Sequence, residues 1–289
     1  MAFARKRIDV TFTLANGVFE GGGNTYTASG LRTSISGAVV GGQQINNFRM
    51  AIFGLPLSVM NQLSTIGPRF QQILNNRIIV KAGDDVSGTH IVFDGNIYTA
   101  MVDATAMPQV ALIVEAKTGY YYQIEPAKPT SIRGSGDVAD MMSQIASRMG
   151  MSFENNGVTA RIANPYYAGS LVKQAGDIAR DAGIIWIMER NVLAINNPGE
   201  KRQGETVLIS PQTGMIGYPL FNQQQIVLKT AFNPAIKFQG EVEVRSDITP
   251  ANGKWIVNSL QYELEAEMPK GRWHMDVVGN IAGNTVAGG

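Results

Sequence analysis

The side chains that most often carry out catalysis are scarce in this sequence. It has no cysteine, which removes disulfides, thiolate metal sites and thiol nucleophiles. Only two histidines are present, His90 and His274, and neither has a second histidine at the spacing of a metal-ligand pair. Ser210 has no base placed to activate it. We therefore expect no catalytic residue, no cofactor, no metal ion and no enzymatic activity.

Carboxylates are the charged groups with the most regular spacing. Glu263, Glu265 and Glu267 recur at every second residue, and Glu241 and Glu243 repeat the pattern. Side chains at this spacing share one face of a strand, so each segment predicts an acidic stripe. Acid–base catalysis usually needs two carboxyls in different environments, which a row of like neighbours does not provide. Two interpretations remain: a sheet face in water, or the wall of a polar channel.

The overall composition limits the classes of partner. The 289 residues include 24 basic and 23 acidic side chains, for a net charge of +1, whereas a dedicated nucleic-acid binder needs a basic excess. Charged residues make up 16% of the chain, compared with about 25% in ordinary soluble domains. The 44% apolar content is enough for real cores. We infer that uncharged polar side chains form much of the surface and that an assembly covers part of it.

The N-terminal segment predicts a strand. Ile8, Val10 and Phe12 alternate with polar residues, which favours a half-buried strand over the continuous apolar region of a signal peptide. No apolar run approaches the ~18 residues of a membrane-spanning helix. We expect no signal peptide and no membrane insertion by this chain.

The pattern along the chain predicts a mainly β protein with an inserted α+β module. We expect a first β-barrel over residues 1–127, the module over 128–200 and a second β-barrel over 201–289. In the module, Asp137 is predicted to cap a helix that stops at Gly150, and a second helix is predicted over Ser170–Ala182, ending at Gly183. A short hairpin over 184–195 follows, so the module contains two helices and a hairpin.

The two outer β regions resemble each other in one detail. Asp94-Gly95 and Asn252-Gly253 each precede an apolar strand, and both pairs are typical of tight hairpin turns. One interpretation is that all antiparallel hairpins look alike. The other is that the chain contains two related β-barrels.

The C-terminal third resembles the C-terminal barrel of bacteriophage tail baseplate hub proteins, the family that includes late control protein D and the hubs of contractile injection systems. The segments ISPQTGMIGYP and FNP, and the region from FQGEVEV to GRWHMDVVG, carry the resemblance. The module segment TSIRGSGDVADMMSQIASRMG also resembles the insertion of these hubs. The matching positions are packing and turn residues: Gly214, Gly217, Pro219, Asn233, Pro234, Gly240, Gly253, Trp255 and Trp273.

The resemblance implies a structural protein of the virion. Hubs of this family are trimers in which two similar barrels per chain form a ring of pseudo-sixfold symmetry between the tail tube and the central spike. The implied partners are two further copies of the chain, the tube or tube-initiator protein, the spike, the tape-measure protein and neighbouring baseplate proteins. DNA would pass through the lumen without specific binding, and the acidic stripes would face that lumen. The implied location is the tail baseplate, with host cytoplasm as the site of assembly.

Two other functions stay open at the level of the sequence. A distal-tail or tube-initiator ring protein would lack the inserted module and form hexamers. A cell-wall-binding or wall-degrading tail protein would use exposed aromatic side chains as sugar platforms, with the runs at residues 120–122 and 166–167 as candidates. Three consecutive tyrosines cannot all face one side of a strand, so we expect at least one of Tyr120, Tyr121 and Tyr122 in a core.

Overall fold

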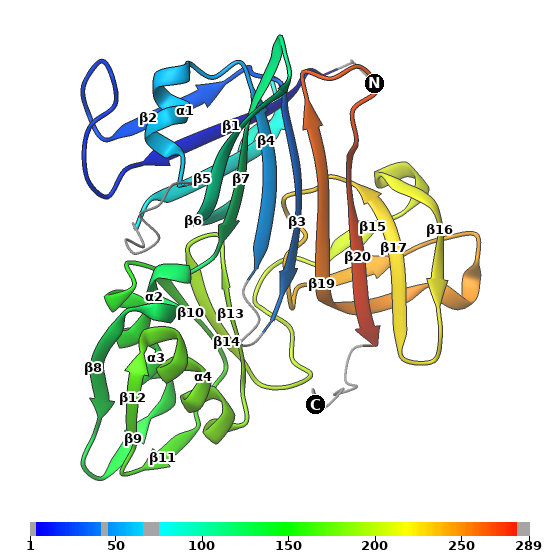
Figure 1. Cartoon of the computed structure of the whole chain (residues 1–289). Helices are drawn as coiled ribbons and strands as arrows, with labels where there is room; N and C mark the ends of the chain where they lie inside the picture. The colour runs from blue at the N-terminus through cyan, green and yellow to red at the C-terminus, as the bar shows by residue number, and fades with distance from the viewer. Residues whose placement is uncertain (1–3, 42–45, 66–74, 282–289) are drawn as a thin grey trace. The chain divides into compact units, whose positions relative to one another are not determined.

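The computed structural model describes residues 4–41, 46–65 and 75–281 (Figure 1). The chain is mainly β with a few short helices, as predicted. It forms two compact units. The first comprises Met1–Gly37, Asn46–Tyr121 and Tyr262–Trp273, and the second comprises Ala38–Ile45, Tyr122–Gln261 and His274–Gly289. The predicted division into three domains, at residues 127 and 200, stays a prediction.

The first unit is built around an antiparallel sheet. Its main elements are β1 (Lys6–Thr13), β2 (Thr25–Ser29), β3 (Thr33–Val40), β4 (Asn47–Phe53), α1 (Leu57–Leu63), β5 (Arg77–Asp84), β6 (Gly88–Ala106), β7 (Gln109–Lys117) and α2 (Tyr120–Ile124). The strand order is β3-β4-β7-β6-β5-β1-β2. Ile8, Val10 and Phe12 of β1 are buried, which confirms the predicted alternation.

The second unit contains the inserted elements and the C-terminal strands. The inserted elements are β8 (Pro126–Ser131), β9 (Ser135–Asp137), α3 (Val138–Arg148), β10 (Ser152–Asn156), β11 (Arg161–Ala163), β12 (Tyr166–Ser170), α4 (Leu171–Ala182), β13 (Ile185–Glu189) and β14 (Val192–Asn196). The later elements are β15 (Val207–Ile209), η1 (Pro211–Thr213), β16 (Met215–Phe221), β17 (Gln225–Ala231), β18 (Glu241–Val244), η2 (Thr249–Ala251), β19 (Gly253–Ala266) and β20 (Trp273–Ile281). β19 begins in the second unit and ends in the first.

The two outer β regions share one strand order. The N-terminal region runs β3-β4-β7-β6-β5-β1, and the C-terminal region runs β16-β17-β20-β19-β18-β15. When the additional strand β2 is set aside, the strands of the two regions correspond one to one in both chain order and sheet order. The corresponding strands are β1 and β15, β3 and β16, β4 and β17, β5 and β18, β6 and β19, and β7 and β20. The regions differ in one pairing, because β1 and β5 are antiparallel whereas β15 and β18 are parallel. This common order supports the interpretation of two related β regions.

Neither region closes into a barrel among the described residues, so the prediction of two β-barrels is wrong in that respect. In the first unit the ladder ends at β2, whose hydrogen-bonded partner is β1. Side chains link the start of the described chain to the turn between β19 and β20: Arg5, which precedes β1, binds Glu267, and Lys6 Nζ lies 3.4 Å from the carbonyl oxygen of Gly271. Side-chain contacts therefore take the place of a closing backbone ladder.

The predicted turn at Asp94-Gly95 is also wrong, because both residues lie inside β6, opposite Ile79 and Ile78 of β5. Gly95 is required by close packing, since a Cβ there would lie 2.6 Å from the carbonyl oxygen of Lys117. The other pair, Asn252-Gly253, lies at the end of the connection from β18 to its antiparallel neighbour β19. That connection spans residues 245–252 and includes η2, so it is not a two-residue turn.

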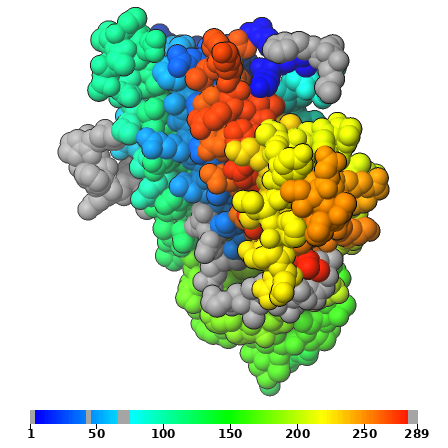
Figure 2. Space-filling view, turned by 90° about the vertical axis from the view of Figure 1, so that its right-hand side faces the viewer, coloured from blue at the N-terminus to red at the C-terminus, as the bar shows by residue number. Residues whose placement is uncertain are grey.

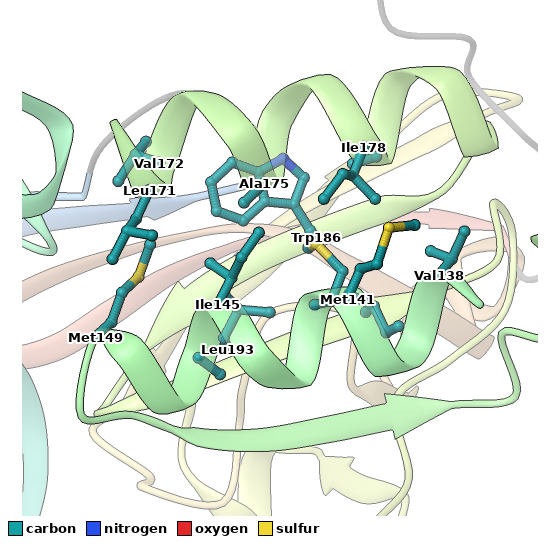
Figure 3. Packing of buried hydrophobic residues seen from close by; sticks show 14 of the residues in the cluster. Val138, Met141, Ile145, Met149, Leu171, Val172, Ala175, Ile178, Trp186 and Leu193 are labelled. Carbon is teal, nitrogen blue, oxygen red and sulfur yellow. The ribbon is translucent and has the colours of Figure 1, made fainter. Parts of the chain in front are cut away.

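The inserted helices have the predicted ends and a shared core. The Asp137 side chain accepts a hydrogen bond from the Asp140 backbone N–H at 3.2 Å, and Ser170 caps α4 in the same way through Lys173. Gly183 ends α4 in the left-handed conformation at φ 66°, which favours glycine. Figure 3 shows the buried faces of the two helices meeting around Trp186 of β13 and Leu193 of β14. The predicted helices and hairpin are confirmed.

This core gives the first prediction. Ile145 of α3 is fully buried in the cluster, whereas its neighbour Gln144 is exposed. Ile145→Ala leaves a cavity and is expected to lower the free energy of unfolding by about 3 kcal/mol. Gln144→Ala is the matched control and should change it by less than about 0.5 kcal/mol. Urea unfolding followed by circular dichroism measures both; equal effects of the two substitutions would contradict the packing described here.

Candidate assembly site

No group of three or more histidine, aspartate or glutamate side chains is arranged to hold a metal ion among the described residues. His90 lies in β6 and His274 in β20. Ser210 precedes η1, and its backbone N–H donates to the Thr213 hydroxyl at 2.8 Å. In the part of the chain that the structure describes, no helix is long and apolar enough to cross a membrane.

The acidic residues of β19 are paired with cations. Arg272 contacts both Glu263 and Glu265, each at 2.8 Å. The Ser36 hydroxyl donates to Glu263 at 2.8 Å. Hydrogen bonds from Arg272 outweigh partial burial and lower the pKa of Glu265. These carboxylates therefore fasten β19 to the start of β20, which is a structural role.

Glu267 lies outside the strand that holds the rest of its stripe. It follows the end of β19 and has a positive φ of 56°. Arg5 binds its carboxylate with two hydrogen bonds, each 2.8 Å long. The Arg5 side chain is exposed, so this pair stabilises the fold only weakly. Of the three glutamates spaced two residues apart, Glu263 and Glu265 thus lie in β19, and Glu267 lies in the turn that follows it.

The other two acidic residues lie in β18 and differ in burial. Glu241 is 8% exposed and accepts from Lys201 at 3.0 Å, from Lys254 at 3.3 Å and from the Thr206 hydroxyl. The Thr206 hydrogen bond, followed by the two lysines, lowers the pKa of Glu241 to about 2 although burial acts in the opposite direction. Glu243 is more exposed and pairs with Arg245 at 2.7 Å.

The most buried ionic cluster was not predicted from the sequence. Arg202 is 4% exposed and contacts Glu154 of β10 at 2.8 Å and Glu189 of β13 at 2.7 Å. Burial, the largest single cause, would raise the pKa of Glu154, but hydrogen bonds and charge attraction from Arg202, together with the nearby Lys237, lower it overall. The three residues are distant in sequence, so no local spacing could have indicated the cluster. It joins the segment before β15 to the inserted sheet within the second unit.

The residues that carry the family resemblance shape turns and packing. Gly214 has φ 112° and accepts at its carbonyl from the Ala231 N–H at 2.8 Å. Trp255 is buried, and its indole N–H donates to the Ala251 carbonyl at 3.1 Å. Lys6 lies 5.5 Å from the centre of the Trp273 ring. The remaining positions are a positive-φ residue in β16 (Gly217), a buried residue of β16 (Pro219), residues of the connection from β17 to β18 (Asn233, Pro234 and Gly240) and the first residue of β19 (Gly253).

The candidate sugar platforms do not present rows of exposed aromatic rings. Tyr120–Ile124 forms helix α2, not a strand; its tyrosines are partly buried, and Tyr122 packs against the buried cluster of the inserted helices. Tyr166 is exposed, but Tyr167 is buried and donates to Asp181 at 2.9 Å. Burial and this hydrogen bond raise the pKa of Tyr167 to about 12. These contacts identify Tyr167 as a core residue of the second unit.

Comparisons with known proteins agree with the fold. A family model described as baseplate hub gp41 matches residues 7–271. A tail protein from Neisseria meningitidis MC58 has a TM-score of 0.63 at 9% identity and covers 96% of this chain and 97% of its own. The prophage MuSo2 43 kDa tail protein from Shewanella oneidensis has a TM-score of 0.57 at 9% identity and covers 95% and 98%. No curated protein sequence matches significantly.

A third similar structure is the E. coli c3393 protein, described as a component of the type VI secretion system with structural similarity to the T4 tail proteins gp27 and gp5. Its TM-score is 0.58 at 9% identity, with coverage of 86% of this chain and 73% of its own. A chain of a Francisella PdpA–VgrG complex also matches, with a TM-score of 0.52 at 7% identity over 97% of this chain and 53% of its own. At these identities the likeness shows the fold.

The buried carboxylate of β18 gives the second prediction. Its lowered pKa means that the stabilisation is fully present above pH 4.5 and is lost as the pH falls toward about 2. Glu241→Gln is expected to lower the free energy of unfolding at pH 7 by on the order of 2 kcal/mol and to flatten its pH dependence below 4.5. Denaturant titrations between pH 7 and pH 3 measure this. Glu243→Gln, two residues away, is the control and should have a smaller effect at pH 7. An unchanged pH dependence in Glu241→Gln would contradict the assignment.

Proposed function

The chain belongs to the baseplate hub gp41 family of phage tail structural proteins, and we propose that three copies form a ring that joins the tail tube to the central spike. The observation that carries this proposal is the strand order shared by the two β regions, β3-β4-β7-β6-β5-β1 and β16-β17-β20-β19-β18-β15. A trimer with two similar β regions per chain presents six similar surfaces, which a sixfold tube can contact. Closed rings of this kind use head-to-tail contacts between copies.

The proposed partners follow from this position in the baseplate. They are the tube or tube-initiator protein on one side, the spike on the other, the tape-measure protein within and neighbouring baseplate proteins outside. The match to a chain of a PdpA–VgrG complex supports a spike-side partner. We place the protein in the virion, after assembly in the host cytoplasm. The family match spans the inserted module, which favours a hub over a distal-tail ring.

The ring gives the third prediction. Native mass spectrometry of the purified chain, alone and with its tube protein, is expected to show a species at three times the mass of the chain. Permanent interfaces of this type commonly bury more than ~2,000 Å², so the trimer should survive dilution to low micromolar concentrations. A monomer under both conditions would contradict the proposal, and a hexamer of this chain would favour the distal-tail alternative.

The acidic stripes remain proposed lumen residues. Their carboxylates are paired with arginine or lysine, so the surface they form is polar and nearly neutral. Such a wall does not offer DNA phosphates the uncompensated positive charge that would hold them. Glu263 and Glu265 also anchor Arg272, so their reversal would disturb the fold. Glu243 and Glu267 are more exposed and are the residues to vary.

The lumen assignment gives the fourth prediction. In assembled particles, the double variant Glu243→Lys, Glu267→Lys is expected to slow DNA release several-fold at low salt and less at high salt, because screening weakens attraction to phosphates. A DNA-binding dye follows the release. Glu20→Lys, an exposed reversal in the loop before β2, is the control and should release DNA at the normal rate. Normal release by correctly assembled double-variant particles would remove the lumen role.

A further inference from the structure

The β16–β17 hairpin carries an unusual concentration of exposed apolar side chains. Fourteen large apolar side chains are exposed among the described residues, and six of them lie on β16, β17 and the end of β20. Four of these six, Ile216, Tyr218, Leu220 and Val227, form what we call the β16 face, whereas Phe221 and Ile281 line a pocket with Trp255. Leu220 is 74% exposed. Figure 2 views the molecule from the side on which this hairpin lies, shown in yellow. Leu220 and Val227 lie directly opposite each other in the hairpin, and exposed apolar side chains gathered in this way mark a site of protein association.

β16 is also a free edge of its sheet. Among the described strands it is hydrogen-bonded only to β17, and its sequence, MIGYPLF, contains no charged residue. Exposed edge strands usually carry charges that prevent pairing with other chains. The register shifts between Ile216 and Leu220, and Pro219 has no N–H to donate. A long backbone ladder is therefore disfavoured on this edge, so side chains must provide much of any contact.

The shared strand order indicates what covers such an edge. In that order β16 corresponds to β3, and β19 corresponds to β6. β18 pairs with the first four residues of β19, and β3 is a further neighbour of β19. Within the first unit the end of β19 lies beside β3, where Ser36 donates to Glu263 at 2.8 Å. In the N-terminal region, the edge strand β3 is thus covered by the end of β19, which is the strand of the C-terminal region that corresponds to β6.

No described strand pairs with the end of β6 on the side away from β7. β5 pairs with β6 only as far as Asn96, whereas β7 continues along its other side to Ala106. Beyond the last pair with β5, the Thr65 backbone N–H donates to the carbonyl oxygen of Ala100, and the Ala100 N–H donates to the Thr65 hydroxyl. The segment after Ala100, residues 101–106, is what we call the β6 end. Met101 is 41% exposed there. Asp103, also in the β6 end, is exposed and has the opposite charge to Lys229, which lies opposite Ile216 in the β16–β17 hairpin and pairs at 3.7 Å with Asp276 of β20.

We propose that the β16 face of one copy binds the β6 end of a second copy of this chain. The contact joins two different surfaces, so an open row of copies has one free surface at each end until the row closes into a ring. The apolar side chains of β16 and β17 pack around Met101, and Lys229 lies near Asp103. This inference rests on the proposed ring and specifies which surfaces form it.

The absence of cysteine makes a clean cross-linking experiment possible. Leu220→Cys and Met101→Cys are placed in separate chains with different tags, co-expressed, and treated with a short bismaleimide. Because each chain has a single thiol, any product joins two copies. The matched control replaces Met101→Cys with Val86→Cys, which is 76% exposed and lies between β5 and β6. The expected yield of covalent heterodimer is about tenfold higher for the 220–101 pair than for the 220–86 pair.

Native mass spectrometry of the same samples separates failure of this inference from failure of the ring. A trimer whose 220–101 yield only equals the control overturns the proposed contact and leaves the ring standing. A trimer in which chains carrying Leu220→Cys cross-link only to each other also overturns it, because the contact would then be symmetric. Monomers alone overturn both. As an independent measurement, Leu220→Asp should abolish the trimer, whereas Leu57→Asp, at a similarly exposed position in α1, should retain it; a trimer of Leu220→Asp would count against the contact.

Discussion

One strand, β19, pairs with different neighbours at its two ends, and the rest of the structure depends on this shared strand. Its fourteen residues begin beside β18 in the second unit and end beside β3 in the first. Alternation along a strand fixes which side chains are buried, and a shift of one residue would exchange the two faces. Tyr262 and Leu264 are completely buried, while Glu263 between them contacts Ser36 and Arg272. The register at one end of β19 therefore constrains the register at the other.

The shared strand order explains features that are otherwise unrelated. The long strand of each β region, β6 or β19, pairs at its start with the strand that precedes it, and its end extends beyond that partner. The end of β19 has β3 beside it within the chain, and the end of β6 is exposed. Because one strand pattern occurs twice, two features have no covering strand among the described residues: the end of β6 and the sheet edge formed by β16. Apolar residues on both are consistent with burial in an assembly.

Ion pairing explains how a chain with so few charges uses them. Arg202 is buried with Glu189 and also contacts the partly buried Glu154, and the buried Glu241 is paired with the more exposed Lys201 and Lys254. A buried charge is strongly unfavourable unless it is paired and hydrogen-bonded. These groups hold segments together at fixed positions within their unit. Acid–base chemistry would instead need carboxyls with different affinities for protons and access to a substrate.

The sequence by itself determined the local elements. Asp137, Ser170 and Gly183 act on backbone groups within a few residues, so the ends of α3 and α4 could be predicted from neighbouring residues alone. The alternation in β1 was equally local. Only the tertiary structure decided the role of Asp94-Gly95, because β5 holds both residues in a ladder and the backbone at Lys117 leaves no room for a Cβ. Some partners of the glutamates, such as Arg5 for Glu267 and Lys201 for Glu241, come from distant segments. Pairing between distant segments depends on the register of the sheet, which no short stretch of sequence contains.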